Sequence, residues 1–234
     1  MRPALILQYG PTGPPGLLGE WAESRDVPLQ VHHTYLDKKP LPEIDDRAFV
    51  RILGSKHSPL DHDYPEVFAT LDLAHRAVED GIPVLGLCFG GEVLADVLGA
   101  MIEPAPEPEI GWYTIDSDDT EMIAPGPWLE WHYERFTLPP GATQLASSPA
   151  GVQAFVSGPH LAVQFHPEST IEIAADWARS DRQKLEQLGL GDGEDRLEAG
   201  RGDAPAAKSN AFRLFDGFWK RVREERKDPW TWTR

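Results

Sequence analysis

Short apolar runs alternate with amphipathic segments along the first ninety or so residues of the chain. Four runs, at residues 4–8, 29–33, 48–53 and 83–87, have the length and apolar composition of buried strands. Residues 65–80 have helical spacing of apolar positions, with a proline at the start and a glycine directly after the end. This alternation predicts an α/β fold with a doubly wound, mainly parallel sheet and flanking helices.

The pattern changes between residues 110 and 157. Short runs at residues 111–115, 128–136 and 152–156 are rich in aromatic and β-branched residues, and turn-forming residues separate them. We expect these runs to add antiparallel strands to the fold.

The composition divides the C-terminal part in two. Residues 189–210 are dense in Gly, Asp, Glu and Ala and hold few large apolar residues, which predicts a mobile segment. Residues 211–227 resume helical spacing, and their apolar stripe predicts a helix that packs on the core. The tail contains Trp230 and Trp232, which could cap the fold, cover an interface or be exposed.

The size and charge of the chain limit its class. With 234 residues, 41% of them hydrophobic, it is predicted to form a single domain over residues 1–234. No apolar run is long enough to cross a bilayer. The formal net charge of −16 argues against nucleic-acid or membrane partners, because both require a basic surface. A lone cysteine fits a reducing compartment, so we expect a soluble, cytoplasmic protein.

That cysteine, Cys88, lies between a strand-like run and the helical spacing of residues 92–98, with glycines on both sides. A strand-to-helix turn places a thiol beside free backbone N–H groups and the positive end of the helix, which favours the thiolate. Cys88 is therefore a candidate nucleophile. The alternative is a small, inert core cysteine.

A second strand-like run, residues 161–165, ends at a histidine. His166 is followed by a proline, which restricts the backbone, and then by Glu168. A thiol nucleophile needs a base, and the base needs a third group that fixes its tautomer and orientation. Cys88, His166 and Glu168 would fill these three roles.

These residues resemble the class I glutamine amidotransferases, whose nucleophile lies in a Gly-x-Cys-x-Gly-x-Gln turn and whose partners lie in a His-Pro-Glu sequence. Residues 86–92 match the first pattern except at its last position, and residues 166–168 match the second. Residues 131–134, 138–142 and 145–148 look like the connecting segment of free-standing members related to the glutaminase part of GMP synthase. The resemblance runs from about residue 4 to about residue 180.

The resemblance implies an oxyanion hole made by the backbone N–H groups of Phe89 and Ser55. Ser55 follows Gly54 in a turn where the family usually has paired glycines. Gly54, Glu92 and His132 are expected to contact the substrate. For His132, which lies in an aromatic strand, the alternative is a hydrogen-bonded structural histidine.

Glu92 is the main departure from the family pattern, which has glutamine at this position. A carboxylate in place of an amide removes two N–H donors and adds an acceptor-only charge. If Glu92 faces the pocket, the preferred substrate differs from free glutamine, and the charge raises the thiol pKa. The alternative is that Glu92 turns outward on the first helical turn, where a negative charge is favourable.

The resemblance implies hydrolysis of a γ-glutamyl amide through a cysteine thioester, with release of ammonia or an amine. The substrate is then glutamine or a γ-glutamyl compound, and the ammonia goes to a separate acceptor enzyme or a small acceptor. This chemistry needs no cofactor and no metal, and His57, Asp61 and His62 match no zinc signature. A γ-glutamyl peptidase or hydrolase stays open as an alternative, as does a non-catalytic binding module on the same fold.

Overall fold

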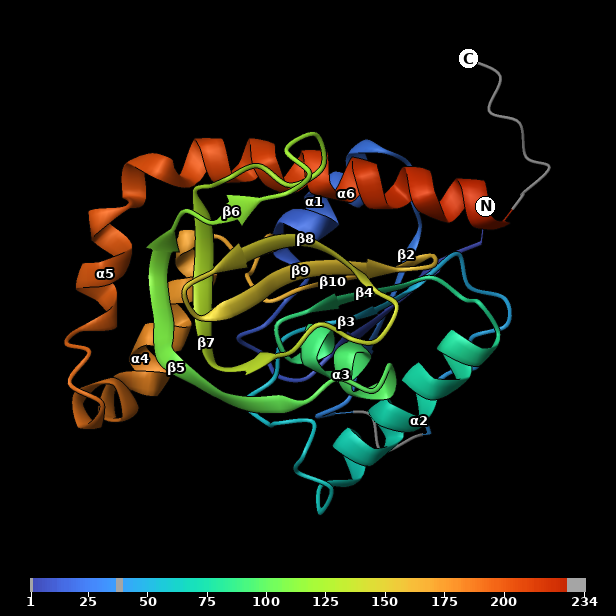
Figure 1. Ribbon diagram of the computed structural model, residues 1–234, viewed down its shortest axis with the longest axis horizontal. Helices are drawn as coiled ribbons and strands as arrows, with labels where there is room; N and C mark the ends of the chain where they lie inside the picture. Colours follow the sequence, from blue (N-terminus) through green and yellow to red (C-terminus); the bar gives the residue numbers. More distant parts are fainter. Residues whose placement is uncertain (1, 37–39, 227–234) are drawn as a thin grey trace.

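The computed structural model describes residues 2–36 and 40–226, apart from the side chains of residues 225 and 226. The predicted helix end at Lys227 and the tail with Trp230 and Trp232 lie outside the described residues. Within them, an eight-stranded sheet forms the middle layer, with helices above and below it in the view of Figure 1.

The order of strands in this sheet is β2-β1-β3-β4-β10-β9-β8-β6. The first five strands run parallel to one another, and the last three continue the sheet as antiparallel neighbours. The predicted fold class is therefore confirmed, including the antiparallel addition. In sheet order the strands are β2 (Leu29–His33), β1 (Ala4–Gln8), β3 (Val50–Ile52), β4 (Val84–Leu87), β10 (His160–Val163), β9 (Gly151–Ser157), β8 (Thr143–Ser148) and β6 (Asp116–Ser117).

Helices bury both faces of the sheet (Figure 1). On one face, Trp21 of α1 and Phe215 of α6 share a buried apolar cluster with Leu85 of β4. On the other, Leu73 of α2 and Val93 of α3 pack in a second cluster with strand residues. Burial on both faces explains why β1 and β4 consist almost entirely of apolar residues. The helices of these two layers are α1 (Gly16–Ser24), α6 (Ala204–Arg226), α2 (Pro65–Glu79) and α3 (Phe89–Val97).

A separate antiparallel pair, β5 (Ile102–Tyr113) and β7 (Trp128–Phe136), curves around one end of the molecule (Figure 1). Helices α4 (Ile171–Gln187) and α5 (Gly193–Ala199) pack against this pair through a third apolar cluster. The N-terminus of α4 is capped by Thr170, whose side chain accepts a hydrogen bond from the N–H of Ile173. This arrangement brings α4 beside the carboxyl ends of the central strands.

The sequence predicts a mobile segment at residues 189–210, but these residues are mainly helical in the structure. These residues form α5, a short 3₁₀ helix η1 (Arg201–Asp203) and the first turns of α6, which begins at Ala204. Asp192 caps α5 by accepting a hydrogen bond from the N–H of Glu194 at 2.8 Å, and Leu197 is 2% exposed. A cap and one buried leucine stabilise this short helix through tertiary packing, which composition alone does not reveal.

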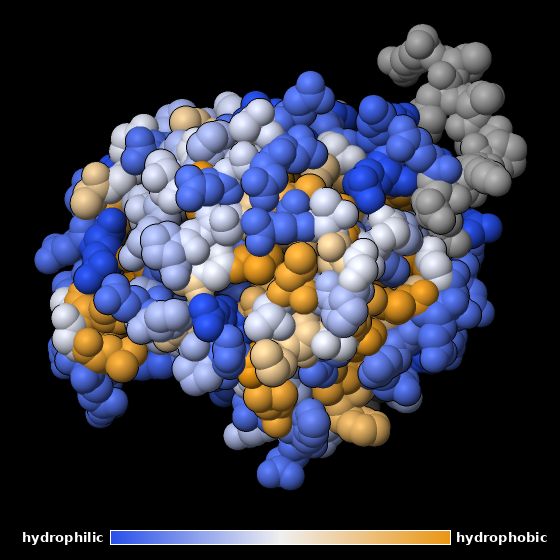
Figure 2. Space-filling model, viewed as in Figure 1, coloured by the Kyte–Doolittle hydropathy of each residue, from blue (hydrophilic) through white to orange (hydrophobic). Residues whose placement is uncertain are grey.

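The surface is consistent with the acidic composition. Figure 2 shows a largely hydrophilic face, interrupted by hydrophobic groups over the α2 and α3 side and near α4 and α5. Among the described helices, none combines the length and apolar character needed to cross a bilayer.

His160 at the start of β10 makes the stability of this fold depend on pH. The side chain is 4% exposed, and burial lowers its pKa from 6.5 to about 4. Between these pH values the unfolded chain binds a proton that the folded chain does not bind. We predict that the free energy of unfolding falls by up to about 3 kcal/mol as the pH drops from about 6.5 to about 4, and that His160→Gln reduces this loss.

Urea unfolding at about pH 7.5 and about pH 4.5 measures this difference, with His75→Gln on the exposed face of α2 as the matched control. An equal pH dependence in wild type and His160→Gln would contradict the prediction.

Candidate active site

Cys88 lies at the turn between β4 and α3, in a left-handed backbone conformation with φ 50° and ψ −113°. Glycines on both sides make this turn possible. A Cβ at Gly86 would lie 2.2 Å from the carbonyl oxygen of Gly90, and one at Gly90 would lie 2.0 Å from that of Ile52. The N–H of Cys88 donates to the carbonyl of Val163 at 2.9 Å, which ties the turn to β10. A strained strand-to-helix turn of this kind presents its side chain at the edge of the sheet.

His166 and Glu168 lie in the loop that follows β10. Two backbone hydrogen bonds of 2.8 Å fix this loop, one from the N–H of His166 to Leu129 of β7 and one from Leu17 of α1 to the carbonyl of Glu168. The Nδ1 atom of His166 lies 2.9 Å from Oε1 of Glu168. A carboxylate accepts here, so Nδ1 donates and Nε2 is left as the free basic nitrogen.

Cys88 and His166 converge on Gly54. A Cβ at Gly54 would lie 3.0 Å from Cε1 of His166 and 4.0 Å from Cβ of Cys88, so both side chains border the same small residue. The ring of Trp177 also lies against the imidazole, at 4.5 Å between ring centroids. The imidazole of His166 therefore has a glycine and an indole as immediate neighbours.

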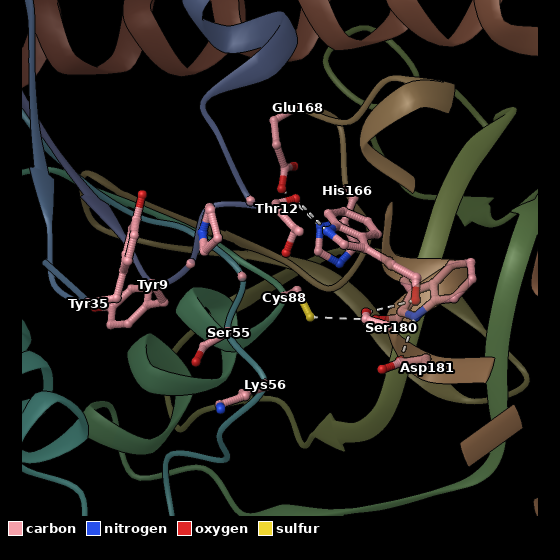
Figure 3. A pocket seen from close by; sticks show the side chains of 16 residues that line it. Tyr9, Thr12, Tyr35, Ser55, Lys56, Cys88, His166, Glu168, Ser180 and Asp181 are labelled. Carbon is pink, nitrogen blue, oxygen red and sulfur yellow. Dashed lines mark hydrogen bonds and ion pairs between the residues drawn. The ribbon is translucent and has the colours of Figure 1, made fainter. Parts of the chain in front are cut away.

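One cavity of about 520 Å³ opens onto these residues. In Figure 3, Cys88 lies at its centre, with Tyr9 and Tyr35 toward one end and Asp181 toward the other. The predicted residues Gly54, Ser55, Cys88, His166 and Glu168 all line it. The other lining residues are Tyr9, Gly10, Pro11, Thr12, Gly13, Tyr35, Lys56, Trp131, Trp177, Ser180 and Asp181.

Of the two predicted oxyanion donors, Phe89 directly follows Cys88 in the chain, and Ser55 lines the cavity. Phe89 is the first residue of α3, and its backbone N–H interacts with the sulfur of Cys88, while its side chain packs against Tyr9 at 5.1 Å between ring centroids. Ser55 lines the cavity directly after Gly54. Their roles as donors to a developing oxyanion stay predictions.

Glu92 and His132 are not among the residues that line this cavity. The alternative of an outward orientation for Glu92 is also wrong, because its side chain is buried against β10 and its Oε1 accepts a hydrogen bond of 2.9 Å from Nε2 of Gln164. His132 is buried as well, with Nδ1 bonded to the carbonyl of Glu134 and Nε2 to Glu109.

Sequence reasoning missed much of the cavity wall. It placed residues 131–134 near the substrate but chose His132, whereas side chains alternate along a strand and Trp131 is the residue of β7 that lines the cavity. Asp181 of α4 accepts hydrogen bonds from the Nε1–H of Trp131 at 3.0 Å and the hydroxyl of Tyr133 at 2.9 Å. Trp177 and Asp181 carry no signal in the sequence, because helical spacing does not tell which neighbour a helix meets.

The electrostatics of the free site oppose the thiolate. Burial raises the pKa of the Cys88 thiol well above its usual value, the charges of Glu92 and Glu168 raise it further, and the N–H of Phe89 acts in the opposite direction. The sequence-based expectation of a thiol poised as thiolate by the helix end therefore does not hold, because desolvation is the larger effect.

The pKa of Glu168 is shifted in the opposite direction to that of Cys88. Burial raises its pKa, but the interactions with His166 and with the fully buried Arg51 outweigh burial, and the net pKa is lowered. Nη2 of Arg51 lies 3.5 Å from Oε2 of Glu168. Glu168 is therefore ionised and suited to orient His166.

A second group of buried ionisable residues lies on β5 and β7 and is not part of the cavity lining. Glu109, Glu130 and His132 offer ligand atoms within 4.8 Å of one another and are the residues of the described chain that could hold a metal ion. Nε2 of His132 lies 3.0 Å from Oε2 of Glu109, which also accepts a hydrogen bond from Gln153 at 2.7 Å. Burial and then Glu109 raise the pKa of Glu130 well above its usual value. Direct hydrogen bonds account for Glu109 and His132 without an ion.

Comparison with known proteins agrees with this geometry. The sequence model of the glutamine amidotransferase class-I family matches residues 55–176. A glutamine-hydrolyzing GMP synthase subunit of Ignicoccus hospitalis is 39% identical over 37% of this chain and 50% of its own length. A glutamine amidotransferase-like protein of Salmonella typhimurium is 27% identical over 71% of this chain and 75% of its own. The glutamine-hydrolyzing GMP synthase of Nitrobacter hamburgensis is 32% identical over 64% of this chain, but only 28% of that protein is spanned.

Solved structures share the fold at lower identity. A glutamine amidotransferase from Thermotoga maritima superposes with a TM-score of 0.83 at 23% identity, covering 94% of this chain and 99% of its own. One from Methylobacillus flagellatus gives 0.80 at 24% identity, covering 96% and 95%. The family match spans more than half of the chain and contains Cys88, His166 and Glu168. The chain therefore belongs to the class I glutamine amidotransferase family.

Proposed function

We propose that the protein hydrolyses a γ-glutamyl amide through a thioester on Cys88. The observation that carries this proposal is the arrangement of Cys88, His166 and Glu168 around one cavity, with Nδ1 of His166 fixed by Glu168 at 2.9 Å. Because the thiol pKa is raised in the free site, His166 acts as a general base that takes the thiol proton as the sulfur attacks.

The attack of Cys88 on the γ-carboxamide carbon forms a tetrahedral oxyanion, which the N–H groups of Phe89 and Ser55 stabilise. His166, now protonated, transfers its proton to the departing nitrogen, and ammonia or an amine leaves. The same imidazole then takes a proton from a water molecule that attacks the thioester. This step releases glutamate and returns the proton to the sulfur.

Glutamine is the first substrate to consider, because the GMP synthase relatives are named as glutamine-hydrolysing. In a glutamine amidotransferase the ammonia passes to an acceptor, which we place on a separate protein or on a small molecule. The complete GMP synthase of Nitrobacter hamburgensis is longer than this chain, and the match spans 28% of it.

A γ-glutamyl hydrolase acting on conjugates is the second candidate. The observation in its favour is the length of the cavity, which continues past Cys88 to Ser180 and Asp181 of α4 and thus has space for a group beyond the carboxamide. Release of glutamate from glutamine and from several γ-glutamyl peptides, measured side by side, distinguishes the two candidates.

Our first prediction for the mechanism is that Cys88→Ala lowers glutamate release by about 10³-fold or more, because it removes the nucleophile. Cys88→Ser should lose nearly as much, since a hydroxyl is a weaker nucleophile with the same base. A glutamine-analogue electrophile should label wild type at Cys88 alone, as mass spectrometry of the digested protein would show. Full activity in Cys88→Ala, or labelling at another residue, would exclude the thioester mechanism.

The second prediction ranks the partners of Cys88. His166→Ala should approach the loss of the cysteine variants, whereas Glu168→Gln should lose less, because the amide still holds the ring but no longer stabilises the imidazolium. Steady-state kinetics on the best substrate measure both losses. Wild-type rates in His166→Ala would show that another group is the base.

The third prediction concerns Glu92, whose pKa burial raises to about 7 although the hydrogen bond from Gln164 opposes this. Glu92→Gln removes a negative charge near the thiol above this pH, so the midpoint of Cys88 alkylation should move to lower pH. The ratio of kcat/KM for glutamine to that for a γ-glutamyl peptide should stay unchanged, because Glu92 does not line the cavity. A changed ratio would instead make Glu92 a determinant of substrate choice.

A further inference from the structure

Arg51 occupies a position in the sheet where an apolar residue is expected. It lies in the middle of β3, paired in register with Ile6 of β1 and Leu85 of β4, and its exposure is 0%. Ile6 and Leu85 face the α1 and α6 side of the sheet, so Arg51 faces that side too. Interior strands of a parallel sheet are normally apolar on both faces, and a buried cation without compensation costs several kcal/mol.

The compensation comes from Glu168. Nη2 of Arg51 lies 3.5 Å from Oε2 of Glu168, and the guanidinium carbon lies 5.9 Å from the centre of the Phe215 ring of α6. Among the described residues, the guanidinium nitrogens and Oε2 of Glu168 have no hydrogen-bond partner. The two oxygens of Glu168 are thus divided, with Oε1 on His166 and Oε2 facing Arg51.

Two acidic residues on the surrounding helices are paired elsewhere. Asp216 of α6 binds Arg25, and Glu20 of α1 binds Lys208 of α6. On β1 and β4, the strands beside Arg51, the residues are uncharged. The groups that face Arg51 across the loop after β10 are Glu168 and, behind it, His166.

We propose that Arg51 is a positioning residue of the active site, which holds the Glu168 carboxylate against His166 and supplies the positive charge that sets the pH range in which Cys88 reacts. The inference depends on the proposed function only where it predicts an effect of Arg51 on turnover. Arg51 and Phe215 both lie outside residues 55–176, the stretch that the family model matches.

A purely structural role of Arg51 would not require a positive charge at this position. Replacing a buried ion pair by apolar side chains of similar volume is often neutral for stability, so packing alone does not require an arginine here. Positive charge next to the triad, in contrast, makes each deprotonation within it easier. Removing the charge therefore moves the reactivity of the thiol to higher pH.

The test is the pH dependence of alkylation by iodoacetamide, which reports Cys88 alone because the sequence has a single cysteine. In Arg51→Met the midpoint should rise by about 0.5 pH unit, less than an adjacent charge produces because Glu168 and His166 lie between Arg51 and the thiol. Arg51→Lys keeps the charge and should stay near the wild-type midpoint. The matched control is Arg135→Met, which removes an ion pair with Glu103 at 2.7 Å outside the cavity.

Alkylation requires no turnover, so its outcome is separate from that of the proposed function. An unchanged midpoint in folded Arg51→Met would overturn the inference, even if glutamate release is established. A raised midpoint would support it, even if neither glutamine nor γ-glutamyl peptides are cleaved. If Arg51→Met does not fold by circular dichroism, Arg51→Gln, neutral but able to donate to Oε2 of Glu168, provides the same comparison.

A second measurement, which requires a substrate, tests whether Arg51 acts by holding Glu168 in place or only through the effect of its positive charge on the whole site. In the protein that keeps Glu168, Arg51→Met should lower kcat with little change in KM. In a Glu168→Gln background, Arg51→Met should lower kcat by a further factor of less than about two, because the group that Arg51 positions is already altered. Equal losses in both backgrounds would show that Arg51 does not act through Glu168.

Discussion

The backbone turn at Cys88 is the constraint on which the rest of the site depends. A non-glycine residue at φ 50° costs on the order of 1–3 kcal/mol and persists only where its surroundings fix it. Here β4 approaches the start of α3 so closely at Gly86, and α3 approaches β3 so closely at Gly90, that a Cβ at either glycine would collide with a backbone oxygen. This turn holds the thiol at the end of β4, where a hydrogen bond from its own N–H to Val163 joins it to β10.

Buried ionisable residues of both signs lie around this turn and act on the Cys88 thiol in opposite directions. Buried carboxyl groups at Glu92 and Glu168 raise the pKa of the thiol, in addition to the larger effect of burial. Arg51 lies on the opposite side of Glu168 and offsets part of this negative potential. In the proposed mechanism the thiol stays protonated until His166 removes its proton during attack on the substrate.

The candidate catalytic residues and the cavity walls come from different parts of the chain. Cys88, His166 and Glu168 lie within residues 55–176, which the family model matches, whereas much of the wall lies outside this range. Tyr9 and Tyr35 precede that segment, and Trp177 and Asp181 follow it. The shape of the cavity therefore depends on these flanking elements and on how α4 packs.

The sequence by itself determined the parallel sheet and the candidate catalytic trio, because both depend on local patterns: apolar runs of strand length, glycines beside Cys88, and a proline between His166 and Glu168. Tertiary structure alone decided the rest. It turned Glu92 toward Gln164 and His132 toward Glu109, and it formed α5 through packing on β5 and β7. It also paired Arg51 with Glu168. The reason is that direction and burial of a side chain are set by contacts between residues far apart in the chain, and spacing along the sequence carries no record of them.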